Sequence, residues 1–327
     1  MTIIRRQLLA TLAVSMLSSA MLCATPAISQ AETVRIGLPT KTYWPTTVAE
    51  AAAHQKLFEK EGITAEITIY RGGAEAFEAL AAGAADLILD APSLPAAGRT
   101  KGVMSKAVAN GSMGNFGWQL MVPAKSTIEV KDLNGKKVAI TSAGSGSDLL
   151  ALWTIQDKKI DFTRVPVGGG GLVPNLLAGN VEAAVVYSPL SFQIAKSGEA
   201  RTILDYATAV PPNLTSAWIV TDKFAKEKPE VVQKALNALY GGLMYMRNNR
   251  DEAIKLIAEL YEMPDDIAAA EYENTILKLE TDGSMAGANI PAALQSSLDM
   301  AKLGGMKDLV PAGEIISTQF TPVPTKP

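Results

Sequence analysis

The sequence contains almost no cysteine and almost no histidine. Among its 327 residues, Cys23 and His54 are the single members of each type. Because Cys23 lies in the apolar amino-terminal segment, disulfides, thiolate metal sites and thiol nucleophiles are excluded from the rest of the chain. A lone histidine in an amphipathic stretch also argues against a zinc site or a Ser-His-Asp triad. We therefore expect neither a metal nor a cofactor.

The sequence also lacks basic runs and a long hydrophobic run. Its 30 basic and 33 acidic residues give a net charge of −3, which argues against nucleic acid as a partner. The apolar segment at residues 8–22 is shorter than the ~20 residues that span a bilayer. It follows Arg5 and Arg6, and Ser29-Gln30-Ala31 offers a small-x-small cleavage site. The sequence predicts a signal peptide over residues 1–31, cleaved after Ala31, and a periplasmic protein; an uncleaved anchor is the alternative.

The first stretch after this segment predicts a strand, a loop and a helix. Val34–Leu38 is a short apolar run, and Thr40–Trp44 is a polar and aromatic loop. Thr47 and Glu50 have capping-box spacing, so a helix is expected to begin at Thr47 and to end at Gly62. In open α/β sheets, ligands lie where strand ends meet helix starts. The loop is therefore a predicted binding loop.

Strand and helix patterns alternate along the next part of the chain, which predicts largely parallel sheets covered on both faces. From Thr221 onward the pattern is helical, and Gly241-Gly242 inside one helix predicts a close helix contact. The predicted strands are Ile63–Tyr70, Ala85–Asp90, Ser105–Asn110, Lys136–Thr141, Phe162–Val167 and Val181–Tyr187. The predicted carboxyl-terminal helices are Glu230–Asn248, Asp251–Tyr261, Asp265–Lys278 and Pro291–Lys302.

Two similar stretches predict a division into two lobes. Asn115–Val122 and Asn213–Val220 each begin with Asn, contain one Trp and end in an apolar run. We interpret them as paired crossovers that form a hinge; a single continuous sheet is the alternative. The predicted parts are lobe 1 at residues 32–116 and 218–327, crossovers at 117–122 and 213–217, and lobe 2 at 123–212.

Two further loops follow predicted strands. Thr141–Asp148 is rich in small and hydroxyl side chains and opens a helix, which is typical of an anion-binding helix start. It has neither the phosphate-loop nor the GxGxxG spacing. Tyr187-Ser188-Pro189 is a predicted pocket wall. The acids Asp86, Asp90 and Glu182 form no convincing catalytic pair and are expected to satisfy turns. We therefore expect the chain not to be an enzyme.

These stretches together resemble the solute-binding proteins of ABC importers, in the nitrate/sulfonate/taurine group with the NMT1/THI5-like domain. The resemblance covers residues 32–220 and implies an α/β, bilobal, type II periplasmic-binding-protein fold. The chain departs from the family at Ser188, where members often have an acidic residue before the proline. The motifs that carry the resemblance are GLPTKTYWPTTVAEAAAHQKLFEKEGI, RGGAEAFEALAAGAADLILDAPS, DLNGKKVAITSAGSGSDLLA and LLAGNVEAAVVYSP.

The resemblance implies a monomeric substrate-binding component that delivers its ligand to a membrane permease and its ATPase. We expect the ligand to be a small organic anion, a sulfonate or carboxylate. The alternatives are a neutral heteroaromatic such as a pyrimidine precursor, and a secreted enzyme with an unrecognised carboxylate site. The enzymes of similar fold rely on cysteine, which this chain lacks after its predicted signal peptide. The predicted ligand-binding residues are Lys41, Thr42, Tyr43, Trp44, Ala91, Pro92, Ser93, Asn115, Ser145, Gly146, Ser147, Tyr187, Ser188 and Thr215.

Overall fold

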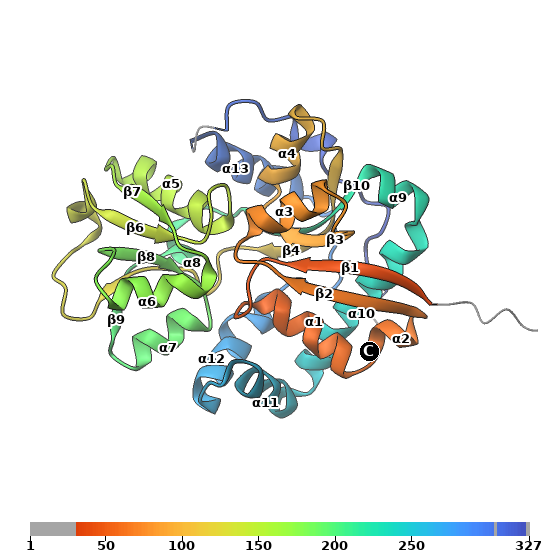
Figure 1. Cartoon of the computed structure of the whole chain (residues 1–327), viewed down its shortest axis with the longest axis horizontal. Coiled ribbons are helices and arrows are strands. Elements are labelled where there is room, and N and C mark those ends of the chain that lie inside the picture. The colour runs from red at the N-terminus through yellow and green to blue at the C-terminus, as the bar shows by residue number, and fades with distance from the viewer. Residues whose placement is uncertain (1–30, 304–305, 325–327) are drawn as a thin grey trace, which may run out of the picture. The chain divides into compact units, whose positions relative to one another are not determined.

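The computed structural model describes residues 31–303 and 306–324, so the predicted signal peptide lies outside the described residues except for Ala31. Strands in these ranges form two five-stranded sheets with helices packed around them, which confirms the α/β class (Figure 1). No helix in the described ranges has the length and apolar character to cross a membrane.

The first sheet has the strand order β2-β1-β3-β10-β4. Strands β1, β2 and β3 are parallel, as predicted, whereas β10 is antiparallel to both β3 and β4. Helices α3 and α4 contact one part of this sheet, and α1 and α10 pack together on the other side (Figure 1). The strands are β1 (Glu32–Leu38), β2 (Ile63–Ile69), β3 (Leu87–Asp90), β4 (Ser105–Met113) and β10 (Leu214–Thr221).

The second sheet repeats this arrangement with the order β7-β6-β8-β5-β9. Its antiparallel strand, β5, again occupies the fourth position. Strand β9 was not predicted, because it is a half-buried edge strand with no regular apolar alternation. The strands are β5 (Gln119–Pro123), β6 (Lys137–Ile140), β7 (Thr163–Pro166), β8 (Ala183–Val186) and β9 (Ala200–Asp205).

The predicted carboxyl-terminal helices are present, except that the predicted helix Asp265–Lys278 ends at Asn274 and is followed by a 3-10 turn, and the short helix Tyr206–Ala209 was not predicted. The first group is α1 (Trp44–His54), α2 (Leu57–Lys60), α3 (Gly73–Ala81), α4 (Ser93–Thr100), α5 (Gly146–Lys158), α6 (Leu172–Leu177), α7 (Leu190–Lys196) and α8 (Tyr206–Ala209). The second is α9 (Asp222–Glu227), α10 (Pro229–Asn248), α11 (Arg250–Tyr261), α12 (Asp265–Asn274) and α13 (Ile290–Leu303). Short 3-10 turns are η1 (Val130–Leu133), η2 (Gly169–Gly171), η3 (Ile276–Lys278) and η4 (Ala312–Glu314).

The predicted start of the first helix is wrong by three residues. Helix α1 begins at Trp44 because Pro45 occupies its first turn, where the fixed φ of proline favours a helix start. Thr47 therefore lies inside the helix and is fully buried, and its hydroxyl is 2.6 Å from the Tyr261 hydroxyl. The helix also breaks at Lys56, which has a φ of +55°, before α2 carries the chain to Gly62.

The close helix contact predicted at Gly241-Gly242 is confirmed. A Cβ atom at Gly242 would lie 2.7 Å from the Val48 carbonyl oxygen and 2.8 Å from the Ala52 nitrogen. The missing side chain thus lets the backbone of α10 approach that of α1, whose face there consists of small residues. This contact fixes α1, and with it the loop that precedes the helix.

Candidate ligand-binding site

A cavity of about 40 Å³ lies between the two sheets, which is room for about three ordered waters. Its walls come from both sheets and from the loops that follow their strands. The lining residues are Pro39, Thr40, Tyr43, Gly73, Leu89, Asp90, Ala91, Trp118, Thr141, Ser145, Gly146, Tyr187, Thr215 and Ser216.

The parallel strands place these residues together. Asp90 is the last residue of β3, Thr141 directly follows β6, and Tyr187 directly follows β8. Tyr43 is the N-cap residue of α1. Because the carboxyl ends of parallel strands meet at one edge of a sheet, the loops of both sheets converge here. The cavity therefore occupies the position where open α/β sheets bind ligands.

Three aromatic rings form one wall of the cavity. The ring centroids of Tyr43 and Trp118 are 5.6 Å apart, those of Tyr43 and Tyr187 are 5.1 Å apart, and those of Trp118 and Tyr187 are 5.2 Å apart. These are ordinary distances for tilted and edge-to-face pairs. The indole N–H of Trp118 donates to the Tyr43 hydroxyl over 3.3 Å, which orients both rings. We call Tyr43, Trp118 and Tyr187 the ring trio.

Asp90 is the one charged residue in the lining that the described residues provide. Its side chain is buried, and Oδ1 accepts a hydrogen bond from the Ala91 N–H over 2.6 Å. Burial raises the pKa of the Asp90 carboxyl to about 7, a shift that the Ala91 hydrogen bond only partly opposes. Strongly perturbed carboxyls of this kind cluster at functional sites.

Several polar atoms of the lining have no internal partner. Within residues 31–303 and 306–324, no hydrogen bond reaches four buried side-chain oxygens of lining residues: Thr40 Oγ1, Asp90 Oδ2, Tyr187 Oη and Ser216 Oγ. Most buried polar atoms in proteins are paired, because an unpaired one costs about 1–3 kcal/mol. Four such atoms around one cavity indicate a site whose hydrogen bonds are completed by a bound molecule.

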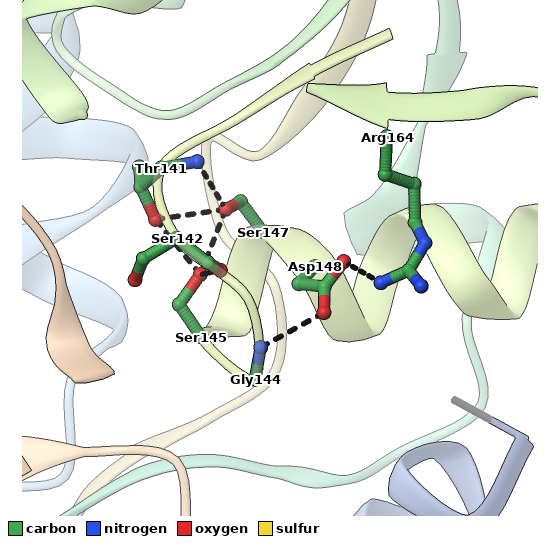
Figure 2. A network of polar contacts seen from close by, with 7 residues as sticks. All are labelled: Thr141, Ser142, Gly144, Ser145, Ser147, Asp148 and Arg164. Atoms are coloured by element: carbon green, nitrogen blue, oxygen red, sulfur yellow. Dashed lines mark hydrogen bonds and ion pairs between the residues drawn. The ribbon is translucent and has the colours of Figure 1, made fainter. Parts of the chain in front are cut away.

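The loop before α5 forms an internal hydrogen-bond network, in which the buried Ser142 Oγ has no partner among the described residues (Figure 2). Ser147 Oγ accepts from the Thr141 N–H over 2.9 Å and lies 3.0 Å from Ser145 Oγ. Asp148 accepts from the Gly144 N–H over 2.8 Å and forms an ion pair with Arg164. Backbone N–H groups that the sequence pattern assigns to an anion thus donate to a carboxylate and a hydroxyl of the protein itself. The network holds Ser145 and Gly146 as a rigid wall of the cavity.

The structure brings six of the predicted binding residues to this cavity, namely Tyr43, Ala91, Ser145, Gly146, Tyr187 and Thr215. That they bind a ligand stays a prediction. The other eight lie outside the lining: Lys41, Thr42, Trp44, Pro92, Ser93, Asn115, Ser147 and Ser188.

The residues outside the lining have identifiable places. Lys41 is exposed, and Trp44 is buried in α1 beside a different small cavity. Asn115 donates to the Asn213 side chain over 2.9 Å, which joins the two similar stretches seen in the sequence. The Ser188 hydroxyl is 2.8 Å from the Thr275 hydroxyl.

Eight lining residues are absent from the predicted ligand-binding set, although Thr40 and Thr141 belong to loops that the sequence singled out: Pro39, Thr40, Gly73, Leu89, Asp90, Trp118, Thr141 and Ser216. A position at the end of a predicted strand was a signal for two of them. Asp90 ends a predicted strand, and Thr141 ends another, which is the position that identified the neighbouring loops. The assignment of Asp90 to a turn is half right, because one of its oxygens accepts from the Ala91 N–H, whereas the other lies against Gly73 with no hydrogen-bond partner among the described residues.

The NMT1/THI5-like family model matches residues 47–253, more than half of the chain. The chain belongs to this family. One relative of this NMT1/THI5-like protein comes from Bacillus subtilis (strain 168) and is named as an aliphatic sulfonate-binding protein. It is 28% identical over 276 residues, which cover 83% of this chain and 81% of the relative.

Solved structures share the fold of this NMT1/THI5-like protein. The alkanesulfonate-binding protein SsuA from Xanthomonas axonopodis pv. citri, bound to MOPS, aligns with a TM-score of 0.74 at 20% identity, over 87% of this chain and 98% of the other. A Candida albicans protein described as having the generic periplasmic binding protein fold aligns at 0.72 and 14% identity, over 88% and 96%. The chain therefore has the periplasmic binding protein fold expected from its sequence.

Proposed function

We propose that this chain is the substrate-binding component of an ABC importer. It captures a small solute between its two sheets and delivers it to the membrane permease and its ATPase, as a monomer in the periplasm. The carrying observation is a cavity lined from both sheets, around which four buried side-chain oxygens have no hydrogen-bond partner within the described residues. The relatives named as binding proteins support a role in binding rather than in catalysis.

Contacts that cross between the sheets support closure about a hinge at Asn115 and Asn213. The Gly169 N–H donates to the Arg71 carbonyl over 2.9 Å, and Lys196 on α7 forms an ion pair with Asp266 on α12. The Ser188 and Thr275 hydroxyls make a further contact. A solute that touches both sheets favours the conformation in which these contacts form, since only that conformation offers it both walls.

A thermal-shift screen tests the proposed function. The panel contains alkyl and aryl sulfonates, carboxylates, nitrate, pyrimidines and small organic amines. A ligand at about a hundred times its dissociation constant adds about 2.7 kcal/mol to the free energy of unfolding, which shifts the melting temperature visibly. We expect at least one class to stabilise the protein. If no compound of the panel shifts the melting temperature of the folded protein, the proposed role as a receptor for small solutes is contradicted.

The ligand class is tested at Lys41. The names of relatives favour a sulfonate, one of the two anions expected from the sequence, and Lys41 is the cation assigned to the anion. Because Lys41 is exposed and lies outside the lining, we expect Lys41→Ala to change the binding free energy by no more than about 0.5 kcal/mol. Isothermal titration with any ligand from the screen measures this. If Lys41→Ala instead lowers the affinity for an anion tenfold, Lys41 does pair with an anionic ligand as the sequence predicts.

A further inference from the structure

The cavity contains a carboxylate that no basic side chain balances. None of the lining residues in the described ranges is lysine or arginine, and Asp90 is the single acid. Basic residues on adjoining strands are already paired, Arg35 with Asp86 and Arg164 with Asp148. In a buried site of low dielectric, such a carboxylate repels an anion and attracts a cation.

The backbone makes room for this carboxylate at one point. A Cβ atom at Gly73 would lie only 2.0 Å from Asp90 Oδ2, so the glycine at the start of α3 permits the observed position. Oδ1 is satisfied by the Ala91 N–H, whereas Oδ2 has no hydrogen-bond partner among the residues that the structure describes. The ionised form of the carboxylate only accepts hydrogen bonds, so a group that binds Oδ2 in this form is a donor.

The ring trio, like the carboxylate, attracts positively charged ligands. The faces of tyrosine and tryptophan rings carry negative potential and attract ammonium-type groups within about 6 Å. Tyr43, Trp118 and Tyr187 line the same cavity as Asp90, with their rings in mutual contact. A cation bound in this cavity therefore has aromatic side chains as well as Asp90 among its neighbours.

We infer, on the basis of the proposed function, that the solute is a small organic cation with an N–H group. Its protonated nitrogen donates to Asp90 Oδ2, and its body lies against the ring trio. The hydroxyls of Thr40, Tyr187 and Ser216, which lack partners, accept any further N–H of the same ligand. This class differs from both the anions and the neutral heteroaromatics expected from the sequence.

Probes matched in shape but not in charge test the inference. One series is benzylammonium, benzyl alcohol and benzoate, and the other is methylammonium, methanol and methanesulfonate. Imidazolium, ethanolammonium and 4-aminopyridinium extend the cations. The purified wild-type protein, Asp90→Asn and Asp251→Asn are titrated by thermal shift and calorimetry. Asp90→Asn keeps the side-chain volume, and Asp251→Asn removes one charge from a fully exposed site on α11.

We expect at least one cation to stabilise the wild type while its matched alcohol and anion do not. Asp90→Asn should weaken that cation at least about tenfold, the effect of losing a charged hydrogen-bond partner, and Asp251→Asn should leave it unchanged. Stabilisation by an anion or a neutral probe alone overturns the inference and leaves the proposed function standing. The inference is also overturned if no cation stabilises the protein. If no compound of the whole panel does so, sulfonates and pyrimidines included, both the inference and the proposed function are contradicted.

Discussion

The side chain of Asp90 illustrates how a single residue can reduce stability at a functional site. In the unfolded chain this carboxyl ionises near pH 4, whereas burial raises its pKa in the folded protein to about 7. Below pH 4 both states are protonated and no penalty exists. Between pH 4 and 7 the unfolded state alone releases its proton, so the folded state loses relative stability. Above pH 7 the loss is constant.

Asp90→Asn should remove this pH-dependent loss. We expect the free energy of unfolding of the variant, relative to wild type, to rise from pH 4.5 to pH 8 by about 3 kcal/mol. Urea unfolding at a series of pH values measures the difference. Glu271 on α12 is fully buried and its pKa is likewise raised to about 7, so both proteins share its contribution and the comparison cancels it. A difference that does not vary with pH contradicts the prediction.

Single residues were the least predictable level of the molecule. The sequence identified Tyr43 and Tyr187 because each follows a strand, and both line the cavity. It gave equal weight to Lys41, yet side-chain direction in a loop depends on tertiary packing, and this lysine points to solvent. The sequence placed Trp118 in a crossover and not in the binding set. It precedes an antiparallel strand, so the rule about the carboxyl ends of strands does not apply to it.

Elements were predicted much better, and their errors have local causes. Patterns of apolar residues located the strands β1, β3, β6 and β8, whose ends form the site. Capping signals were less secure. The spacing of Thr47 and Glu50 predicted a helix start, but proline within the first turn moved it upstream. Strand β9 was missed because an edge strand with mixed exposure has no strong period.

The contact between α1 and α10 gives a test at this level. Gly242→Ala places a Cβ atom against backbone atoms of Val48 and Ala52, which cannot yield as a flexible side chain can. We expect a loss of about 1–3 kcal/mol in the free energy of unfolding, measured by denaturant titration.

The adjacent glycine is a matched control for this change. A Cβ atom at Gly241 meets only the end of the Leu57 side chain, at 3.1 Å. Gly241→Ala should therefore be neutral or stabilising by up to about 1 kcal/mol, because alanine favours a helix interior. Equal effects of the two variants would show that the close contact does not matter for stability.

At the scale of the whole molecule, the proposed closure can be tested with a covalent lock. The Ser188 and Thr275 hydroxyl oxygens are 2.8 Å apart and both residues are buried. Because a cysteine sulfur lies farther from Cβ than a hydroxyl oxygen does, we expect cysteines at these two positions to lie within reach of each other. The double variant Ser188→Cys, Thr275→Cys should form a disulfide with the sheets together. Cys23 is the single natural cysteine and belongs to the predicted signal peptide.

We expect oxidation of the double variant to slow both binding and release of a ligand, and a reductant to restore them. Stopped-flow fluorescence of the tryptophans, one of which lies in the ring trio, measures the two rates. Each single cysteine variant is the control for the effect of the substitution itself. If the oxidised protein exchanges ligand as fast as the reduced one, the sheets need not separate for exchange.

The interlaced strands also determine which sheet can be completed first as the chain emerges from its amino-terminal end. All five strands of the second sheet lie between Gln119 and Asp205, so this sheet can form once that stretch has emerged. The first sheet begins earlier but requires β10 between β3 and β4, and β10 ends at Thr221. Until then β3 and β4 keep unpaired edges, which are prone to aggregation. The half of the protein that is made first is thus the last to be finished.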